Sequence, residues 1–345
     1  MLVTVLVPSC SRIFFECSRM SDIEPIFYTP NDEGLIDKVG RKFGLRDSQS
    51  TMWTRLGLAG GREQLRNVYA MWLSPALYLP SQQIRCLIGE MPSLRWVYSQ
   101  MAGVDHLDLD AFRERNIILS NNGNLSSRRV AEMILACIFA HAKRLPMHFA
   151  LQQRRKWQSL PSDDLRGETV AILGTGNIGQ EVAIMCKAVG LHVAGASRNP
   201  EKFGKHNSPY DEVVAINSGL DRLLAEADYV VVSVPLNKIT KGMVGRAELR
   251  KMKQTACLIS VARGEVVVES ELASVLRDRS IDSAFIDRPS QVPLKWWSGL
   301  YSVPNLFITH YSATNSTRVT NDGFEQFVHG VRSMLDGGQP PNKVA

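Results

Sequence analysis

The second half of the chain carries short, unbroken apolar runs that are separated by segments long enough to form helices. A strand of a parallel sheet is buried on both faces and therefore reads as a continuous apolar run. Parallel strands also need long crossover connections, which the spacing provides. The pattern predicts a parallel α/β sheet. Its expected strands are residues 170–173, 193–195, 229–234, 256–260 and 306–309.

The first 120 residues or so also predict α/β structure, built from shorter units. Residues 2–7, followed by Pro8, are expected to form the opening strand. Further strands are expected at 85–88, 94–98 and 117–120, with helices between them.

A long helix is predicted from Ser126 to about Leu145, closed by Pro146, and a second helical stretch continues to Trp157. Ser126 or Ser127 can cap the long helix. Apolar side chains recur at helical spacing along one face: Val130, Met133, Ile134, Cys137, Ile138, with His141 following. This face is larger than one helix needs for a small domain, which favours a partner. One last helix after Ser316 ends near Gly337.

The composition is that of an ordinary globular protein, with 44% hydrophobic and 21% charged residues. The net charge of +6 is scattered, with the densest basic clusters at 128–129 and 154–156. A nucleic-acid partner is therefore not expected. The longest apolar run, 133–140, is far shorter than a membrane span, so no membrane partner is expected either.

The six cysteines are isolated, and no C-x-x-C or Cys/His cluster has zinc-ligand spacing. We expect no metal site. Buried thiols in a reducing compartment explain the cysteines, which makes a cytoplasmic location the expectation. Residues 1–19 carry Arg12 and Arg19 among several serines, which leaves an organellar targeting segment as an alternative.

A G-x-G-x-x-G motif follows the strand at 170–173 and opens a helix. This strand–turn–helix context is typical of a dinucleotide site. Gly174 would permit the tight turn, Gly176 the approach of a pyrophosphate, and Gly179 the packing of helix on strand. The free N–H groups of the helix would bind the phosphates. The predicted cofactor-binding residues here are Gly174, Thr175, Gly176, Asn177, Ile178 and Gly179.

The end of the second strand indicates which dinucleotide is bound. An NAD enzyme places an acidic residue there, on the ribose 2′-hydroxyl. This chain has Ser197 and Arg198, which can bind a 2′-phosphate. NADP(H) is therefore favoured as cofactor, and NAD(H) stays possible. A solvated Arg198 with no ligand is the alternative.

From residue 94 onward the chain resembles the D-isomer-specific 2-hydroxyacid dehydrogenases. The resemblance rests on motifs in family order. These are 101–106 (MAGVDH), 130–132 (VAE), 165–170 (LRGETV), 234–236 (VPL), 251–253 (KMK) and 259–264 (ISVARG). Together with the glycine motif they are specific, whereas the first 90 residues contribute little.

The resemblance implies two Rossmann-like domains, one flavodoxin-like and one dinucleotide-binding, with a deep interdomain cleft. Residues 1–121 plus 314–345 would form the substrate domain, and 122–313 the cofactor domain, with a dimerisation helix at 126–145. It also implies a homodimer and a small carboxylate substrate. Arg263 would grip that carboxylate, a role that suits a guanidinium; a structural salt bridge is the alternative. The same resemblance assigns Met101, Ala102 and Gly103 to the substrate side, and Val234, Pro235, Ala262, Arg263 and Asp287 to the cofactor.

The catalytic pair of the family is missing. The family uses a histidine as proton donor and a glutamate that keeps it charged. Alignment without a gap puts Tyr311 at the histidine position and Val292 at the glutamate position. A glutamate without its imidazole would be a buried carboxylate lacking a partner, so the two losses make sense together.

Two replacement donors are considered. His310 could substitute by a one-residue slip, but adjacent side chains at a strand end point to opposite faces, so a packing histidine is favoured. Tyr311 could donate a proton itself; an aromatic that merely fills a vacated site is the equal alternative. The prediction is thus an NAD(P)-dependent 2-hydroxyacid oxidoreductase with catalytic residues Arg263, Tyr311 and His310. The alternatives are a dinucleotide-binding pseudoenzyme that acts as a sensor or interaction partner, and a different dinucleotide-assisted reaction.

Overall fold

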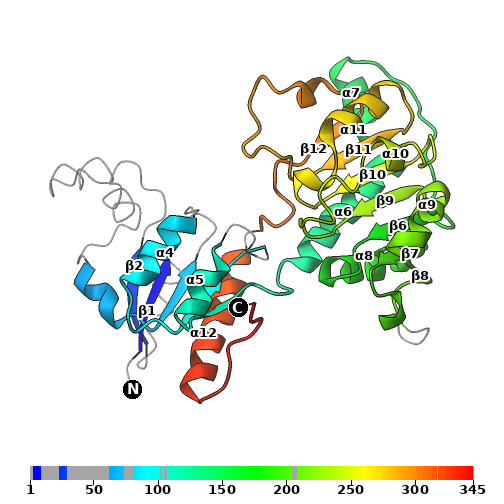
Figure 1. The fold of residues 1–345 in the computed structure, drawn as a ribbon. Helices are drawn as coiled ribbons and strands as arrows, with labels where there is room; N and C mark the ends of the chain where they lie inside the picture. The colour runs from blue at the N-terminus through cyan, green and yellow to red at the C-terminus, as the bar shows by residue number, and fades with distance from the viewer. Residues whose placement is uncertain are drawn as a thin grey trace. The chain divides into compact units, whose positions relative to one another are not determined.

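The computed structural model describes residues 3–8, 23–28, 62–73, 81–101, 103–104, 107–203, 208–316 and 318–344. The chain divides into two compact units (Figure 1). One is Met1–Leu125 with Thr317–Ala345, and the other is Ser126–Ser316. The boundaries expected from sequence, after residues 121 and 313, lie a few residues earlier. Part of the residue 1–19 segment, for which targeting was considered, lies outside the described residues.

The first unit contains a five-stranded sheet whose neighbouring strands are all parallel. Its order, β2-β1-β3-β4-β5, is the flavodoxin-like order that the resemblance implied. The strands are β1 (Val3–Pro8), β2 (Ile23–Tyr28), β3 (Ala70–Leu73), β4 (Trp96–Ser99) and β5 (Ile118–Ser120). A 3-10 helix, η1 (Arg62–Asn67), precedes β3, and α5 (Leu109–Glu114) precedes β5.

The strand expected at 85–88 is wrong, because these residues lie in helix α4 (Ser81–Gly89). Ile84, Leu87, Ile88 and Met91 are all buried, and their spacing of three and four residues is the helical period. A short apolar run fits a strand or a buried helix face equally well, and here the residues before it decide for the helix.

The last helix, α12 (Val319–Leu335), belongs to the first unit and covers its sheet. Its apolar face packs on large aromatic residues of β3 and β4. Trp96 and Phe327 are stacked with ring centroids 5.1 Å apart. A Cβ at Gly330 would lie 2.3 Å from the Trp96 ring, so a glycine is required for this close approach. The chain therefore returns to its first sheet after completing the second unit.

The second unit contains a seven-stranded sheet, again with parallel neighbours throughout. Its strand order is β12-β11-β10-β9-β6-β7-β8. The chain starts at the central strand β6, adds β7 and β8 on one side, and then adds β9 to β12 on the other side, as in the doubly wound dinucleotide-binding fold. The strands are β6 (Thr169–Leu173), β7 (His192–Ser197), β8 (Glu212–Ala215), β9 (Tyr229–Val232), β10 (Cys257–Ser260), β11 (Ser283–Ile286) and β12 (Leu306–Ile308).

Helices bury both faces of this sheet, which explains its unbroken apolar strands. Val170 and Ile172 of β6 pack in one cluster with α6 and α8, whereas Ala171 and Leu173 pack in another with α9, α10 and α11. The helices are α6 (Ser127–Ala142), α7 (Leu145–Gln153), α8 (Asn177–Ala188), α9 (Ile216–Glu226), α10 (Arg246–Leu249) and α11 (Glu269–Arg277). Three 3-10 turns complete the unit: η2 (Pro200–Lys202), η3 (Gly264–Val266) and η4 (Gly299–Ser302).

The long helix expected at 126–145 ends earlier, because Arg144 adopts a left-handed conformation with φ 52°. Pro146 lies in the first turn of α7, where its missing N–H costs nothing. The apolar face of α6 is also not free for a partner, since Val130, Ile134, Cys137 and Ile138 are buried in the unit's own core. That argument for a dimer is therefore wrong. Among the described residues, no helix is long and apolar enough to cross a membrane.

Candidate functional site

The predicted site residues of the second unit gather at one edge of its sheet. Because all seven strands are parallel, their carboxyl ends meet at this edge, which we call the carboxyl edge. Gly174 follows β6, Ser197 ends β7, and Val234 follows β9. Arg263 follows β10, Asp287 follows β11, and Tyr311 follows β12.

The glycine loop has the geometry that a dinucleotide needs. Gly174 has φ +107°, and a Cβ there would lie 3.0 Å from the backbone of Ser233 and Val234. A Cβ at Gly179 would lie 2.0 Å from the Gly174 carbonyl oxygen, so this position has no room for a side chain. Gly176, by contrast, caps the twelve-residue helix α8, and a Cβ there would meet nothing within 4 Å. Open space at a helix N-terminus fits a phosphate group.

The other residues of the motif surround that opening. Thr175 and Ile178 are half-buried, and Asn177 is exposed. At the end of β7, the Ser197 hydroxyl accepts a hydrogen bond from the Asn199 backbone N–H at 3.2 Å. This turn leaves Arg198 exposed, and residues 197–199 include no acidic side chain. The end of β7 therefore offers a cation and a hydroxyl, and no carboxylate.

Arg263 lies at the start of a closely packed turn. It caps η3, and a Cβ at Gly264 would lie 2.0 Å from the Ser290 backbone nitrogen. The loop after β10 thus packs directly on the loop after β11. Glu269 holds that second loop, since its carboxylate accepts hydrogen bonds from the Ser290 N–H at 2.6 Å and hydroxyl at 2.7 Å. Val234 and Ala262 are buried in the core.

Pro235 is exposed, and its carbonyl accepts a hydrogen bond from the Thr240 hydroxyl. This contact holds the loop after β9 in shape. The role of this loop toward a cofactor stays a prediction, as do the roles of Val234 and Ala262.

Asp287 organises the turn after β12. Its side chain is only 6% exposed, and Oδ1 accepts hydrogen bonds from the Thr309 hydroxyl at 2.5 Å, the Ser312 N–H at 2.9 Å and the Ala313 N–H at 3.1 Å. Its backbone carbonyl accepts a fourth hydrogen bond, from the Tyr311 N–H at 2.6 Å. Sequence reasoning placed Asp287 near the cofactor and missed this role.

The turn that Asp287 holds changes the argument about His310 and Tyr311. Strand β12 ends at Ile308, and both residues have left-handed φ angles of 53° and 58°. The alternation of side chains along a strand therefore does not apply to them, and that reason for discounting His310 is wrong. The His310 ring is exposed and stacks on Tyr301, with centroids 6.4 Å apart. His310 remains a candidate by position.

Tyr311 is not a packed filler of a vacated site, because its side chain is 39% exposed. Its hydroxyl lies 3.4 Å from Arg288 Nη1, which donates a hydrogen bond to it, and the guanidinium carbon lies 4.7 Å from the ring centroid. Val292 is 47% exposed, so a glutamate there would not be the buried carboxylate that the sequence argument assumed. The argument that burial explains why the histidine and the glutamate are lost together is therefore wrong. The sequence contained one weak signal of the Arg288 contact, a basic residue two positions after the last residue of the buried strand β11.

The predicted substrate residues of the first unit lie just after β4. Met101 is half-buried, and its N–H donates to the Ser99 hydroxyl at 3.3 Å. Gly103 is half-buried, and Ala102 lies outside the described residues. Met101 and Arg263 belong to different units, so their meeting in one cleft stays a prediction.

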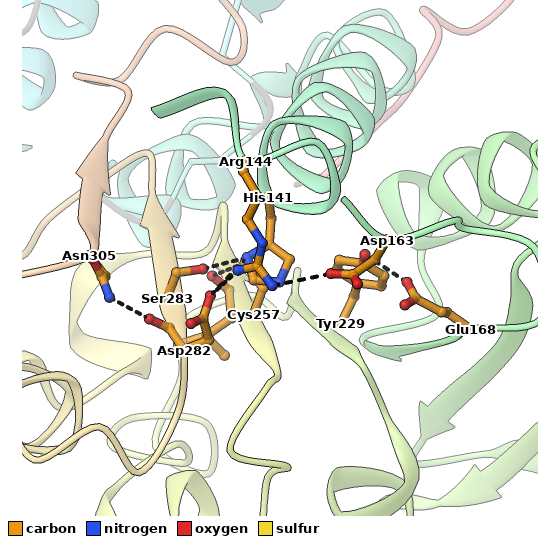
Figure 2. A network of polar contacts seen from close by, with 10 residues as sticks. His141, Arg144, Asp163, Glu168, Tyr229, Cys257, Asp282, Ser283 and Asn305 are labelled. Carbon is orange, nitrogen blue, oxygen red and sulfur yellow. Dashed lines mark hydrogen bonds and ion pairs between the residues drawn. The ribbon is translucent and has the colours of Figure 1, made fainter. Parts of the chain in front are cut away.

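The opposite edge of the second sheet, which we call the amino edge, carries a polar network instead (Figure 2). His141 Nδ1 lies 2.8 Å from the Ser283 hydroxyl, and Arg144 bridges Asp282 at 3.0 Å and Asp163 at 3.2 Å. Asn305 donates to the Asp282 carbonyl at 3.0 Å. Burial lowers the pKa of His141, and it raises the pKa of the nearby Cys137 thiol to about 12.

The amino-edge network ties α6 and the segment after α7 to the starts of β10 and β11, and we assign it to stability. In the described part of the chain no group of His, Cys, Asp or Glu could hold a metal ion.

A seven-stranded doubly wound sheet with this glycine loop at its reversal point defines the class of dinucleotide-binding α/β proteins. Comparison with known proteins narrows the class. Residues 135–313 match the family described as D-isomer specific 2-hydroxyacid dehydrogenase, NAD binding domain. Over 263 residues the chain is 32% identical to glyoxylate/hydroxypyruvate reductase B of Yersinia enterocolitica, covering 71% of this chain and 79% of the relative.

Solved structures share the whole fold. A family protein from Aeromonas salmonicida superposes with a TM-score of 0.78 at 24% identity, covering 100% of this chain and 99% of the other. An NADPH-dependent glyoxylate/hydroxypyruvate reductase from Sinorhizobium meliloti, in complex with NADP and sulfate, superposes with a TM-score of 0.74 at 20% identity, covering 100% and 98%. The chain belongs to the D-isomer specific 2-hydroxyacid dehydrogenase family and contains its NAD-binding domain. Its relatives are named reductases and dehydrogenases, so its class is oxidoreductase.

Proposed function

We propose that this chain is an NADP(H)-dependent reductase of small 2-keto acids. The observation that carries the proposal is the open position at Gly176, at the N-terminus of α8, beside a β7 end that offers Arg198 and no carboxylate. The relative named glyoxylate/hydroxypyruvate reductase B supports the substrate class. The solved reductase named with NADP supports the coenzyme.

The residues at the carboxyl edge would divide the work as follows. The glycine loop and the first turn of α8 would hold the pyrophosphate, and Ser197 with Arg198 would hold the 2′-phosphate. Arg263 would bind the substrate carboxylate through two parallel N–H···O bonds. Tyr311 would donate the proton to the carbonyl oxygen. When bound, the reduced nicotinamide would supply the hydride.

The first test is a titration of NADPH fluorescence, followed by initial-rate assays with glyoxylate, hydroxypyruvate and pyruvate. We expect NADPH binding and reduction that is slow by the standard of the family, since the tuned histidine is absent. Arg263→Lys should raise the KM of the keto acid much more than it changes NADPH affinity, because lysine cannot form the paired contact with the carboxylate. A chain that does not bind NADPH contradicts the proposal.

A pseudoenzyme is the second candidate, and the absence of histidine and glutamate at 311 and 292 favours it. It predicts NADPH binding with no turnover of any keto acid. It also predicts that Tyr311→His with Val292→Glu creates activity. The same assays therefore separate the two candidates.

We also propose that the protein is a cytosolic homodimer. All four described cysteines are free thiols, which suits a reducing compartment. Large apolar side chains on and after α7 are exposed: Leu145, Met147, Phe149 and Trp157. Such side chains are favoured in interfaces. Sedimentation of a monomer at micromolar concentration contradicts the dimer.

A further inference from the structure

Arg288 and Tyr311 lie on turns that leave neighbouring strands at the carboxyl edge. Strands β11 and β12 pair in parallel, with Ile286 opposite Ile308, and the two residues follow shortly after this last pair. The Arg288 guanidinium covers the Tyr311 ring at 4.7 Å from its centroid and donates to the phenolic oxygen at 3.4 Å. The turn after β11 thus places a cation next to the hydroxyl that the turn after β12 presents.

The charge of Arg288 is directed at this phenol and at no acid. Among the described residues, no salt bridge involves Arg288, although it follows Asp287 directly. The Asp287 carboxylate is buried and already accepts three hydrogen bonds from the turn after β12. Arg288 itself is half-buried, which strengthens its interaction with the phenol relative to water.

The Tyr311 backbone adopts an unfavourable conformation, although its side chain is not buried in the core. A left-handed φ of 58° is unfavourable for a bulky residue. The hydrogen bond from the Tyr311 N–H to the Asp287 carbonyl keeps it there, while the side chain stays 39% exposed. A backbone conformation that costs energy and keeps a polar side chain partly exposed is typical of a functional position.

We propose that Tyr311 and Arg288 form a single proton-donating unit that replaces the missing histidine and glutamate, with Tyr311 as the catalytic residue and Arg288 as its positioning residue. This inference rests on the proposed function. The Tyr311 O–H bond breaks and its proton goes to the carbonyl oxygen, which becomes the hydroxyl of the product. The phenolate that remains is balanced by the guanidinium and regains a proton from water. The carbonyl carbon takes a hydride from a reduced nicotinamide.

The unit explains why the loss of the glutamate is tolerated. A glutamate would stabilise a charged imidazolium, whereas a phenol becomes negative when it gives up its proton and needs a cation. A donor that becomes an anion therefore requires the opposite partner. The exposed apolar Val292 and the guanidinium of Arg288 beside the phenol both fit this reversal of charge.

The test compares Tyr311→Phe, Arg288→Gln and Arg288→Lys with Arg277→Gln, an exposed arginine at the end of α11. Tyr311→Phe should lower kcat by about 10²–10⁴-fold. Arg288→Gln should lower it by about 10–100-fold, since a charge-assisted hydrogen bond is lost. Arg288→Lys should restore part of this. NADPH affinity and the KM of the keto acid should change less than about twofold. Arg277→Gln should match the unmodified protein.

Two further readouts do not depend on the rate of the intact enzyme. In the protein without coenzyme, Arg288→Gln should alter the near-ultraviolet tyrosine signal that Tyr311→Phe removes, and Arg277→Gln should not. Guanidinium in solution should rescue the smaller variant Arg288→Ala and leave Tyr311→Phe inactive.

Full kcat in Arg288→Gln or in Tyr311→Phe would overturn the unit while the proposed function stands. An unmodified protein that binds NADPH and reduces no keto acid would overturn the proposed function, and the unit with it.

Discussion

The two edges of the second unit's sheet are built from the same strands and have opposite properties. At the amino edge, His141, Ser283 and Asp282 lie in one closely bonded network (Figure 2). At the carboxyl edge, Gly176 borders open space, and the side chains of Arg198 and Tyr311 are exposed. Buried polar groups that are paired stabilise a fold, whereas accessible polar groups are available to ligands.

The residues that we propose to carry the chemistry are confined to one edge of the sheet. The parallel sheet and its two apolar layers form the body of the unit, and Arg288, Val292 and Tyr311 all lie in the loops that follow β11 and β12. Chemistry can change in loops at the carboxyl edge because the rest of the unit does not depend on those side chains.

The largest expected effect comes from exchanging glycines of the carboxyl edge. Gly264→Ala puts a Cβ 2.0 Å from the Ser290 nitrogen, so the backbone must shift, at a cost of about 1–3 kcal/mol or more. Gly176→Ala meets nothing within 4 Å and should change stability by less than about 0.5 kcal/mol. Urea unfolding of both variants checks this. Equal destabilisation would show that Gly176 serves the fold.

Coenzyme choice should depend on Arg198. If its guanidinium binds the 2′-phosphate, Arg198→Ala loses about 1.5–3 kcal/mol of NADPH binding and leaves NADH binding nearly unchanged. The ratio of the two dissociation constants should then fall more than tenfold. Fluorescence titrations with both coenzymes measure it. Equal affinity of the unmodified protein for NADPH and NADH would exclude this role.

At the amino edge, Asp282→Asn should lower stability and leave the coenzyme alone. The Asp282 carboxylate lies 3.0 Å from Arg144, and the two side chains are 31% and 30% exposed. Partial exposure limits the loss to about 1–2 kcal/mol. Asp221→Asn, whose partner Lys251 is on the surface, is the control and should change little. An unchanged unfolding midpoint for Asp282→Asn would mean that the network contributes nothing.

The smallest effect concerns pH. Burial lowers the pKa of His141 below 6.5. The positive charge of Arg144 lowers this pKa further, whereas the negative charge of Asp282 raises it in part. The unfolded state therefore binds more protons, and stability falls as the pH drops below about 6.5, by at most about 1.4 kcal/mol per pH unit. Two other residues also lie near the His141 ring: the charge of Asp163 raises its pKa, and the Tyr229 ring packs against it edge to face.

His141→Gln should flatten the slope between about pH 7 and pH 5.5. Chemical denaturation of both proteins across this range measures it. An unaltered slope would assign the acid sensitivity to other groups.

How far the sequence predicted this structure depended on how local each signal was. Continuous apolar runs such as 170–173 predicted the buried strands, because a strand covered on both faces tolerates few polar residues. The strand predicted from the run at 85–88 was wrong, because the helical spacing of the buried residues becomes visible only when Ile84 and Met91 on either side are included. The family resemblance assigned Tyr311 and Val292 to the positions of the catalytic pair, and this assignment stays a prediction. It did not reveal the Arg288 contact, because two turns far apart in sequence meet only through the pairing of β11 and β12.

The contrast between the two edges implies that the carboxyl edge of the second unit binds NADP(H) while the amino edge serves stability. It is tested most directly by NADPH fluorescence titration of the unmodified protein, Gly176→Ala and Asp282→Asn under identical conditions. We expect Gly176→Ala to weaken binding at least tenfold, because its Cβ occupies the space for the pyrophosphate, and Asp282→Asn to bind as the unmodified protein does. Unchanged affinity in Gly176→Ala, or a comparable loss in Asp282→Asn, would contradict it.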